Sequence, residues 1–125
     1  MKITQASPIF RIFDEFRARE FYLDFLGFEI QFEHRFEPNM PLYMGIRLGD
    51  FILHLSEHAG DATPVSGVYI EMTGLDEYQK TLAAKNYKYC RPEIAESGYG
   101  TRLMKIIDPF HNWLSFNERI DGKNL

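Results

Sequence analysis

A short histidine motif is the first feature of the sequence that could carry chemistry. His54 and His58 stand four residues apart with Glu57 between them, which on a helix would place both imidazoles on one face, as in zinc-binding helices. However, apolar residues alternate with the others over residues 51–55, and this alternation predicts a strand. Because a strand rises about 3.3 Å per residue, the two rings would stand about 13 Å apart, too far to share an ion. His54 is therefore either a partly buried, hydrogen-bonded imidazole or a ligand contact.

The loop Ser97–Gly100 is a second candidate, because it holds Tyr99 between Gly98 and Gly100. Flanking glycines let the backbone bend and leave the ring exposed. Tyr99 is then either a ring on which a ligand stacks or an incidental member of a glycine turn. The loop lacks the spacing and the lysine of a phosphate-binding loop.

The remaining reactive residue types offer less. Cys90 is the only cysteine, which excludes an intramolecular disulfide and a zinc site of several thiolates, and its place beside Pro92 favours an inert thiol. His58 and His111 are expected in surface turns, and His34 lies just beyond a strand with no evident partner. No Ser-His-Asp order with plausible geometry stands out.

Composition limits the class of protein. A chain of 125 residues with 45% hydrophobic and 26% charged residues is typical of one globular domain. The net charge of −4 is opposite in sign to that of most nucleic-acid binders. No apolar run is long enough for a membrane helix, and the residues before Ile9 contain no signal-peptide core, so we expect a cytoplasmic protein. Aromatic residues make up 15% of the chain, enough to build a core and line an apolar pocket.

The elements that would position these residues form two similar halves. In the first half, Asp14 is a good N-cap, Gly27 suits the position after a helix, and apolar residues alternate over residues 28–33 as in a half-buried strand. The expected elements are a strand over 9–13, a helix over 15–26, strands over 28–33, 42–48 and 51–56, a loop over 37–41 and a hairpin turn at 49–50.

The second half repeats this βαβββ order at an offset of about 60 residues. Residues 57–67 form the linker, and we expect the tail over residues 121–125 to be frayed. The expected elements are a strand over 68–72, a helix over 75–85, a weak strand over 87–90, strands over 102–107 and 113–117, and a turn over 108–112.

The paired modules and the motifs at residues 21–28 and 108–112 resemble the vicinal oxygen chelate superfamily of glyoxalase, bleomycin-resistance and dioxygenase proteins. Residues 6–8 and 49–58 are similar to its bleomycin-resistance branch. The resemblance implies an α+β domain over residues 1–120, with modules at about 8–58 and 67–118. The strands of each module would curl into a mixed sheet that forms a cup for the ligand, with the helices outside.

The resemblance also gives four positions for a metal. Enzymes of the superfamily hold a divalent ion with ligands from the first and last strands of each module. These positions hold Ser7, His54, Gly67 and Ser115. Because a catalytic ion normally takes three or more ligands of the His, Asp, Glu or Cys type, we expect no metal and no other cofactor.

Several side chains could line the cup. In bleomycin-resistance proteins the place equivalent to Tyr99 carries an aromatic ring that stacks on the drug. Trp113, Tyr43 and Tyr69 could form an aromatic wall, or each could pack elsewhere. Glu71 could neutralise a cationic ligand or pair with Arg11 or Arg47. The candidate ligand-binding residues are Tyr99, His54, Trp113, Tyr43, Tyr69, Glu71, Ser115, Gly98 and Gly100.

The function that the sequence favours is a metal-free protein that sequesters a bulky, flat, cationic antibiotic of the bleomycin type, without chemistry and without nucleic-acid or membrane partners. The resemblance implies a homodimer, with Pro8 as a hinge that lets the first strand cross to the partner. Two alternatives stay open. One is a metal-dependent enzyme of glyoxalase, dioxygenase or thiol-transferase type, and the other is an interaction module with an empty cup.

Overall fold

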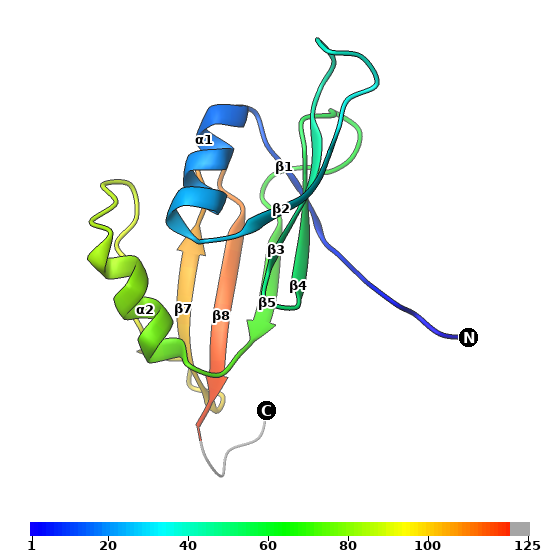
Figure 1. Ribbon diagram of the computed structural model, residues 1–125. Helices are drawn as coiled ribbons and strands as arrows, with labels where there is room; N and C mark the ends of the chain where they lie inside the picture. Colours follow the sequence, from blue (N-terminus) through cyan, green and yellow to red (C-terminus); the bar gives the residue numbers. More distant parts are fainter. Residues whose placement is uncertain (121–125) are drawn as a thin grey trace. The chain divides into compact units, whose positions relative to one another are not determined.

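The computed structural model describes residues 1–120, so the expected tail at 121–125 lies outside the described residues. The chain divides into two compact units. Unit 1 comprises Met1–Ser66 together with the turn Asp108–Asn112, and unit 2 comprises Gly67–Ile107 and the chain from Trp113. Each unit contains a four-stranded mixed sheet and a helical segment (Figure 1). The predicted α+β fold of two βαβββ-like modules is confirmed.

The sheet of unit 1 has the strand order β1-β4-β3-β2. Strand β1 runs parallel to β4, and the other neighbours are antiparallel. The elements are β1 (Ile9–Arg11), α1 (Glu15–Arg19), η1 (Glu20–Phe25), β2 (Glu29–His34), β3 (Tyr43–Leu48) and β4 (Phe51–Ser56).

The helix of unit 1 begins and ends where its residue types predict. The Asp14 side chain accepts a hydrogen bond from the Arg17 amide at 3.0 Å, which satisfies a backbone donor that the first turn leaves open. Gly27, with φ +88°, follows the last turn. The second part of the helix, η1, is wound as a π-helix, shown by the Leu26 amide donating to the Phe21 carbonyl at 2.9 Å. Helical periodicity did not predict this change of winding.

One face of the unit 1 sheet belongs to the core. Its side chains are almost completely buried and alternate with those of the other face, as strand geometry requires. They are Phe10, Ile12, Met44, Ile46, Leu53 and Leu55.

Strand β2 differs from the prediction of a half-buried strand. All six of its residues are exposed. A bulge between Ile30 and Phe32 shifts the register, so the two apolar side chains do not share one face. Phe28 lies before the strand and is buried, in edge-on contact with the Tyr22 ring (5.8 Å) and the Phe51 ring (6.0 Å).

The sheet of unit 2 has the strand order β5-β8-β7-β6, again with one parallel pair, β5 with β8. Helix α2 contacts β7 and β8. The expected strand over residues 87–90 is wrong: the segment is a turn in which the Cys90 amide donates to the Tyr87 carbonyl at 3.3 Å. The elements are β5 (Gly67–Glu71), α2 (Leu75–Ala84), β6 (Ala95–Glu96), β7 (Thr101–Ile107) and β8 (Trp113–Arg119).

The turn Asp108–Asn112 is a buried polar structure. Asp108 Oδ1 accepts from the amides of Phe110 and Asn112, both at 2.8 Å, and Oδ2 accepts from the Tyr22 hydroxyl at 2.7 Å. Burial raises the pKa of Tyr22 well above its ordinary value, so this phenol is a donor. The motif at residues 108–112 therefore has a structural role, and exposed His111 is a surface turn residue as predicted.

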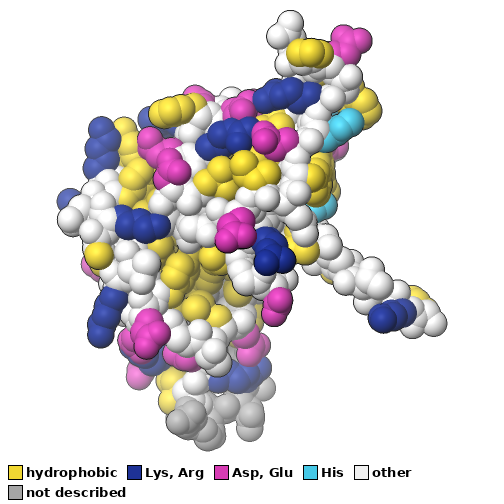
Figure 2. All heavy atoms as spheres, in the orientation of Figure 1, with side chains coloured by type: hydrophobic (Ala, Val, Ile, Leu, Met, Phe, Trp, Pro, Cys, Tyr) yellow, Lys and Arg dark blue, Asp and Glu magenta, His cyan; other side chains and the backbone are white. Residues whose placement is uncertain are grey.

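Within residues 1–120, no helix is long and apolar enough to cross a membrane. On the face drawn in Figure 2, acidic and basic side chains are interspersed with apolar ones. This face therefore shows no stripe of a single charge sign of the kind that nucleic-acid binders use.

Candidate functional site

The face of the unit 1 sheet that is turned away from the core carries three aromatic rings, which with one glycine form the His54 cluster: Phe32, Tyr43, Gly45 and His54. Register pairs Phe32 with Gly45 and Gly45 with His54. The Phe32 ring lies on Gly45, where a Cβ would come within 2.2 Å of Phe32 Cε2. Phe32 is nearly parallel to the Tyr43 ring (15°, centroids 6.2 Å apart) and perpendicular to His54 (87°, 5.3 Å).

His54 is half-buried in this cluster. Its Nδ1 is hydrogen-bonded to the Tyr43 hydroxyl at 2.7 Å. Its Nε2 is buried and has no partner within residues 1–120. Burial lowers the pKa of His54 and raises that of Tyr43, so the imidazole is neutral and the phenol protonated near neutral pH. The structure thus shows a partly buried, hydrogen-bonded imidazole, which is one of the two alternatives that the sequence left open for His54. Its Nε2 stays without a partner among residues 1–120.

The corresponding face of unit 2 has a similar arrangement. Trp113 is the register partner of Gly67, and a Cβ at Gly67 would lie 1.9 Å from Trp113 Cε2. The Lys105 ammonium lies 4.8 Å from the centroid of the indole ring. Tyr69 and Ser115 are paired in the next row of the sheet, and the Tyr69 ring is 42% exposed.

Glu71 does not pair with Arg11 or Arg47. Its carboxylate accepts two hydrogen bonds from Arg119, at 2.7 and 3.2 Å. The expected ion pair is wrong because β8 continues to Arg119, two residues beyond the predicted end of the strand. Arg11 instead lies over the Phe13 ring, 4.4 Å from its centroid, and donates to the carbonyl of Glu57.

Tyr99 lies in the short loop between β6 and β7, with a ring that is 44% exposed. Both flanking glycines have positive φ, +87° for Gly98 and +101° for Gly100, which side chains rarely adopt. Ser97 holds the loop, since its Oγ accepts hydrogen bonds from the Tyr99 amide (3.1 Å) and from Thr101. Sequence reasoning missed this role of Ser97.

The predicted site residues therefore fall into two groups. Tyr43 and His54 contact each other in unit 1. Of the three rings predicted to form an aromatic wall, Trp113 and Tyr69 lie on the sheet of unit 2 and Tyr43 lies on the sheet of unit 1. The predicted residues in unit 2 are Trp113, Tyr69, Glu71 and Ser115 on one sheet, and Gly98, Tyr99 and Gly100 in the loop.

The residues at the four metal positions do not fit a divalent ion. The Ser7 hydroxyl accepts from Gln5 (2.8 Å), and the Ser115 hydroxyl accepts from Asn117 (2.9 Å). The indole ring covers Gly67, which leaves one imidazole as the only strong ligand of the four. Within residues 1–120 no group of three His, Cys, Asp or Glu side chains is placed to hold a metal.

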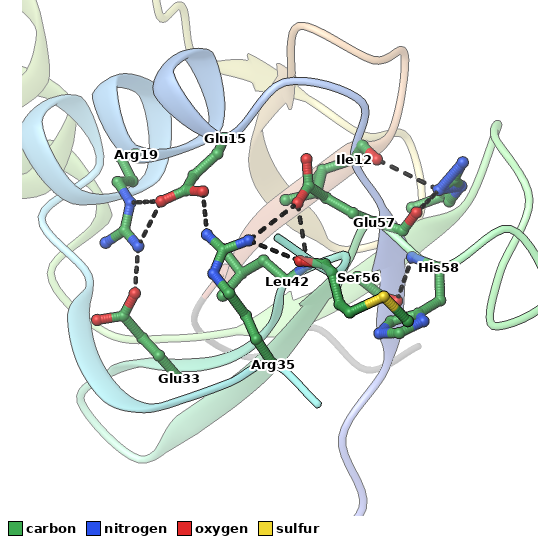
Figure 3. A network of polar contacts seen from close by, with 11 residues as sticks. Ile12, Glu15, Arg19, Glu33, Arg35, Leu42, Ser56, Glu57 and His58 are labelled. Atoms are coloured by element: carbon green, nitrogen blue, oxygen red, sulfur yellow. Dashed lines mark hydrogen bonds and ion pairs between the residues drawn. The ribbon is translucent and has the colours of Figure 1, made fainter. Parts of the chain in front are cut away.

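A network of polar contacts supports the edge strand β2, which carries Phe32 (Figure 3). Arg19 bonds to both Glu15 and Glu33, and Arg35 bonds to Glu15 and lies 3.9 Å from Glu57. Burial alone would raise the pKa of Glu15, but hydrogen bonds from Arg35 and Arg19 hold it below its ordinary value. The network connects α1 to the end of β2 and to the segment after β4.

Two further predictions are tested by ring contacts and burial. His34 has a partner after all, since its ring is perpendicular to that of Phe36 with centroids 4.7 Å apart. Cys90 lines a hollow of about 320 Å³ near the end of α2, together with Tyr87 and Pro92. Burial raises the pKa of this thiol, which favours the unreactive protonated form.

Comparisons with known proteins agree with this architecture. A family model described as "Glyoxalase superfamily protein" matches residues 1–123. A glyoxalase/bleomycin resistance protein/dioxygenase superfamily member from Sphaerobacter thermophilus DSM 20745 is 21% identical, with TM-score 0.65, covering 94% of this chain and 98% of that one. A search among curated proteins finds no significant match.

Two antibiotic-binding proteins also share the fold. A bleomycin-binding protein complexed with bleomycin is 21% identical, with TM-score 0.67 and coverage of 94% and 100% of the two chains. TnmS3, an antibiotic binding protein from Streptomyces sp. CB03234, is 13% identical, with TM-score 0.66 and coverage of 96% and 99%. At these identities, the similarity establishes the fold.

Proposed function

Because the chain belongs to the glyoxalase superfamily, and because its residues do not fit the metal of that superfamily's enzymes, we propose that it sequesters a bulky, planar aromatic antibiotic of the bleomycin type without altering it. The observation that carries this proposal is the Trp113 ring, which lies against Gly67, its register partner in the unit 2 sheet. The antibiotic-binding proteins of the same fold support it.

Aromatic surface is the main source of affinity in this proposal. Tyr69 and Tyr99 are 42% and 44% exposed, and Trp113 is half-buried. A ring that stacks on another contributes roughly 0.5–1.5 kcal/mol beyond the area it buries, so two or three such contacts would add about 1–4.5 kcal/mol to the binding free energy.

Charge contributes less than the sequence suggests. The expectation of a cationic ligand rests on the net charge of −4 and on Glu71. Arg119 already neutralises this carboxylate, so a cationic ligand would have to share Glu71 with the guanidinium or displace it. The proposal therefore rests on stacking, with bleomycin as the first ligand to test.

Trp113 makes the test direct, because it is the only tryptophan in the chain. Titration with bleomycin should quench its fluorescence, and the drug should be recovered with unchanged mass. At 100 times its dissociation constant a ligand raises the free energy of unfolding by about 2.7 kcal/mol, so the melting temperature should rise in parallel. A saturating titration with neither effect would refute binding of this drug, and a change of drug mass would refute sequestration.

One observation favours the alternative of a metal-dependent enzyme: His54 occupies a family metal position, and its Nε2 has no partner among residues 1–120. Stoichiometric divalent metal in freshly purified protein would support that alternative. The residues at the other three positions, Ser7, Gly67 and Ser115, argue against a metal-dependent enzyme because none of them is a strong metal ligand.

We also propose a homodimer with an exchanged first strand. Residues 1–6 are exposed, and Ile3 is 76% accessible. Pro8 precedes β1, and its carbonyl accepts from the His54 amide at 3.0 Å, so the chain joins the sheet at this residue. Sedimentation at micromolar concentration should show a dimer, and a monomer would contradict the proposal.

A further inference from the structure

The unpartnered nitrogen of His54 requires a physical explanation. Buried polar groups nearly always have a hydrogen-bond partner, and each exception points to strain, a functional role or a missing partner. His54 Nε2 is the one buried side-chain nitrogen or oxygen without a partner in the described part of the chain. Leaving such a group unsatisfied is destabilising, so a ligand that supplied the missing partner would stabilise the protein.

The hydrogen bond to Tyr43 determines what Nε2 can offer. The Tyr43 hydroxyl has His54 Nδ1 as its only hydrogen-bond partner within residues 1–120. A hydroxyl that donates to Nδ1 leaves the proton of the neutral imidazole on Nε2, and we assign this tautomer to His54. Tyr43 is thus a positioning residue for the imidazole, and Nε2–H is a hydrogen-bond donor without an acceptor among residues 1–120.

The Phe32 and Tyr43 rings are both in contact with His54. The Phe32 ring is perpendicular to His54, nearly parallel to Tyr43 and in close contact with Gly45. A planar ligand that replaced this ring would meet the same three groups: a glycine, a parallel phenol and a perpendicular imidazole.

Phe32 is also placed to move. It lies on β2, the edge strand of the sheet, and is 39% exposed. The bulge next to it interrupts the pairing with β3. The other rings of the cluster lie on the inner strands β3 and β4.

We propose that Phe32 is a displaceable cover that occupies the place of the ligand's ring, and that the ligand accepts a hydrogen bond from His54 Nε2–H. This inference rests on the proposed function, because it assumes a planar aromatic ligand. It adds the chemical class of the ligand. The ligand is a planar aromatic molecule that carries a carbonyl or similar hydrogen-bond acceptor at its edge, not an aromatic hydrocarbon without an acceptor.

Two matched probes separate these classes. 9-Oxofluorene-2-carboxylate and fluorene-2-carboxylate share ring system, charge and size, and differ in one carbonyl group. Calorimetric titration should show tighter binding of the oxo probe, by about tenfold, the value of a hydrogen bond to a buried donor. His54→Phe removes the donor and should abolish this preference.

The role of Phe32 is tested by its removal. If the ring competes with the ligand, Phe32→Ala should bind both probes about three- to tenfold more tightly, because ligand binding no longer displaces an aromatic contact. Phe36→Ala is the matched control: it removes the same side chain just beyond β2, where Phe36 is 72% exposed and outside the His54 cluster. It should leave both affinities unchanged.

A spectroscopic measurement follows His54 directly. The chain contains four histidines, and the ring ¹⁵N signals of His54 are assigned by their loss in His54→Phe. The signals should show the Nε2–H tautomer, and Nε2 should shift on addition of the oxo probe but not of fluorene-2-carboxylate. Tyr43→Phe should reduce the population of this tautomer, which a merely structural tyrosine would not do.

The outcomes distinguish this inference from the proposed function. Three outcomes would each refute the inference and leave aromatic binding intact. They are weaker binding by Phe32→Ala, equal binding of the two probes, and an Nε2 signal that does not shift on addition of the oxo probe. Failure of both probes to bind the native protein and Phe32→Ala would refute the inference, whereas the proposed function is decided separately by the bleomycin titration.

Discussion

The indole ring of Trp113 lies on Gly67, its register partner in the parallel pair of β5 and β8. A Cβ at Gly67 would come within 1.9 Å of Cε2 and 2.1 Å of Cζ2, so no other residue fits beneath the ring in its present position. The family resemblance gives position 67 to a metal ligand. In this chain the same position is the floor of an aromatic surface, and the two roles exclude each other.

Substitution Gly67→Ala should therefore displace the indole. Overpacking of this kind costs about 1–3 kcal/mol, and the displaced ring should change the emission wavelength of the single tryptophan. Gly60→Ala is the control, because a Cβ there meets no atom within 4 Å. Unchanged emission of Gly67→Ala would show that the ring does not rest on the glycine in solution.

The two glycine–aromatic pairs mark the limit of what the sequence predicts. The alternation of apolar residues along the strand correctly predicts that Leu53 and Leu55 lie on the buried face and His54 on the other, because successive side chains of a strand point to opposite faces. Phe32 and Trp113 cover their glycines through pairing across strands, which no local pattern contains. The available signal was weaker: a glycine inside a strand often marks a close approach of another group.

Two other differences have identifiable causes. The bulge at Gln31 breaks the period of two in β2, so alternation placed Ile30 and Phe32 together where the structure separates them. The sequence offers Arg11 or Arg47 as the partner of Glu71, but the partner is Arg119. The apolar pattern of the last strand ends at residue 117, whereas the strand itself continues to Arg119. Both errors concern the ends and irregularities of strands, because tertiary packing rather than the local sequence pattern determines where a strand bulges or ends.

The contact between Tyr22 and Asp108 predicts a stability effect. Tyr22→Phe removes the hydroxyl that donates to the buried carboxylate at 2.7 Å, and the loss of a donor from a buried charged group costs about 1–3 kcal/mol. Chemical denaturation should show a lower free energy of unfolding. The control is Tyr99→Phe, whose hydroxyl takes part in no hydrogen bond among residues 1–120, and an equal effect of the two changes would contradict the prediction.

The pH dependence of stability should contain a contribution from His54. Burial lowers its pKa in the folded state, so below about pH 6.5 the unfolded chain binds a proton that the folded chain resists. Stability is therefore lost as the pH falls from about 6.5 towards the lowered pKa. The melting temperature of the native protein should decrease more steeply over this range than that of His54→Gln, and parallel curves would argue against a buried neutral imidazole.

Removal of metal should have no effect on the fold. Among Ser7, His54, Gly67 and Ser115, His54 is the only strong ligand, so no structural ion is available to a chelator. The melting temperature should be the same with and without a chelator. A decrease of several degrees would overturn the metal-free assignment and revive the enzyme alternative.

Tyr99 provides the most direct test of the binding surface in unit 2. Its ring is 44% exposed between two glycines, so it contributes little to the core, and both Tyr99→Ala and Tyr99→Trp should fold. Loss of the stacking contact and of the ring area should weaken bleomycin binding by about 10- to 100-fold in Tyr99→Ala. Tyr99→Trp should keep or raise the affinity, because the larger ring stacks better. Native affinity in Tyr99→Ala would exclude the ring from the site, whereas unfolding of that variant would show that the loop packs as core.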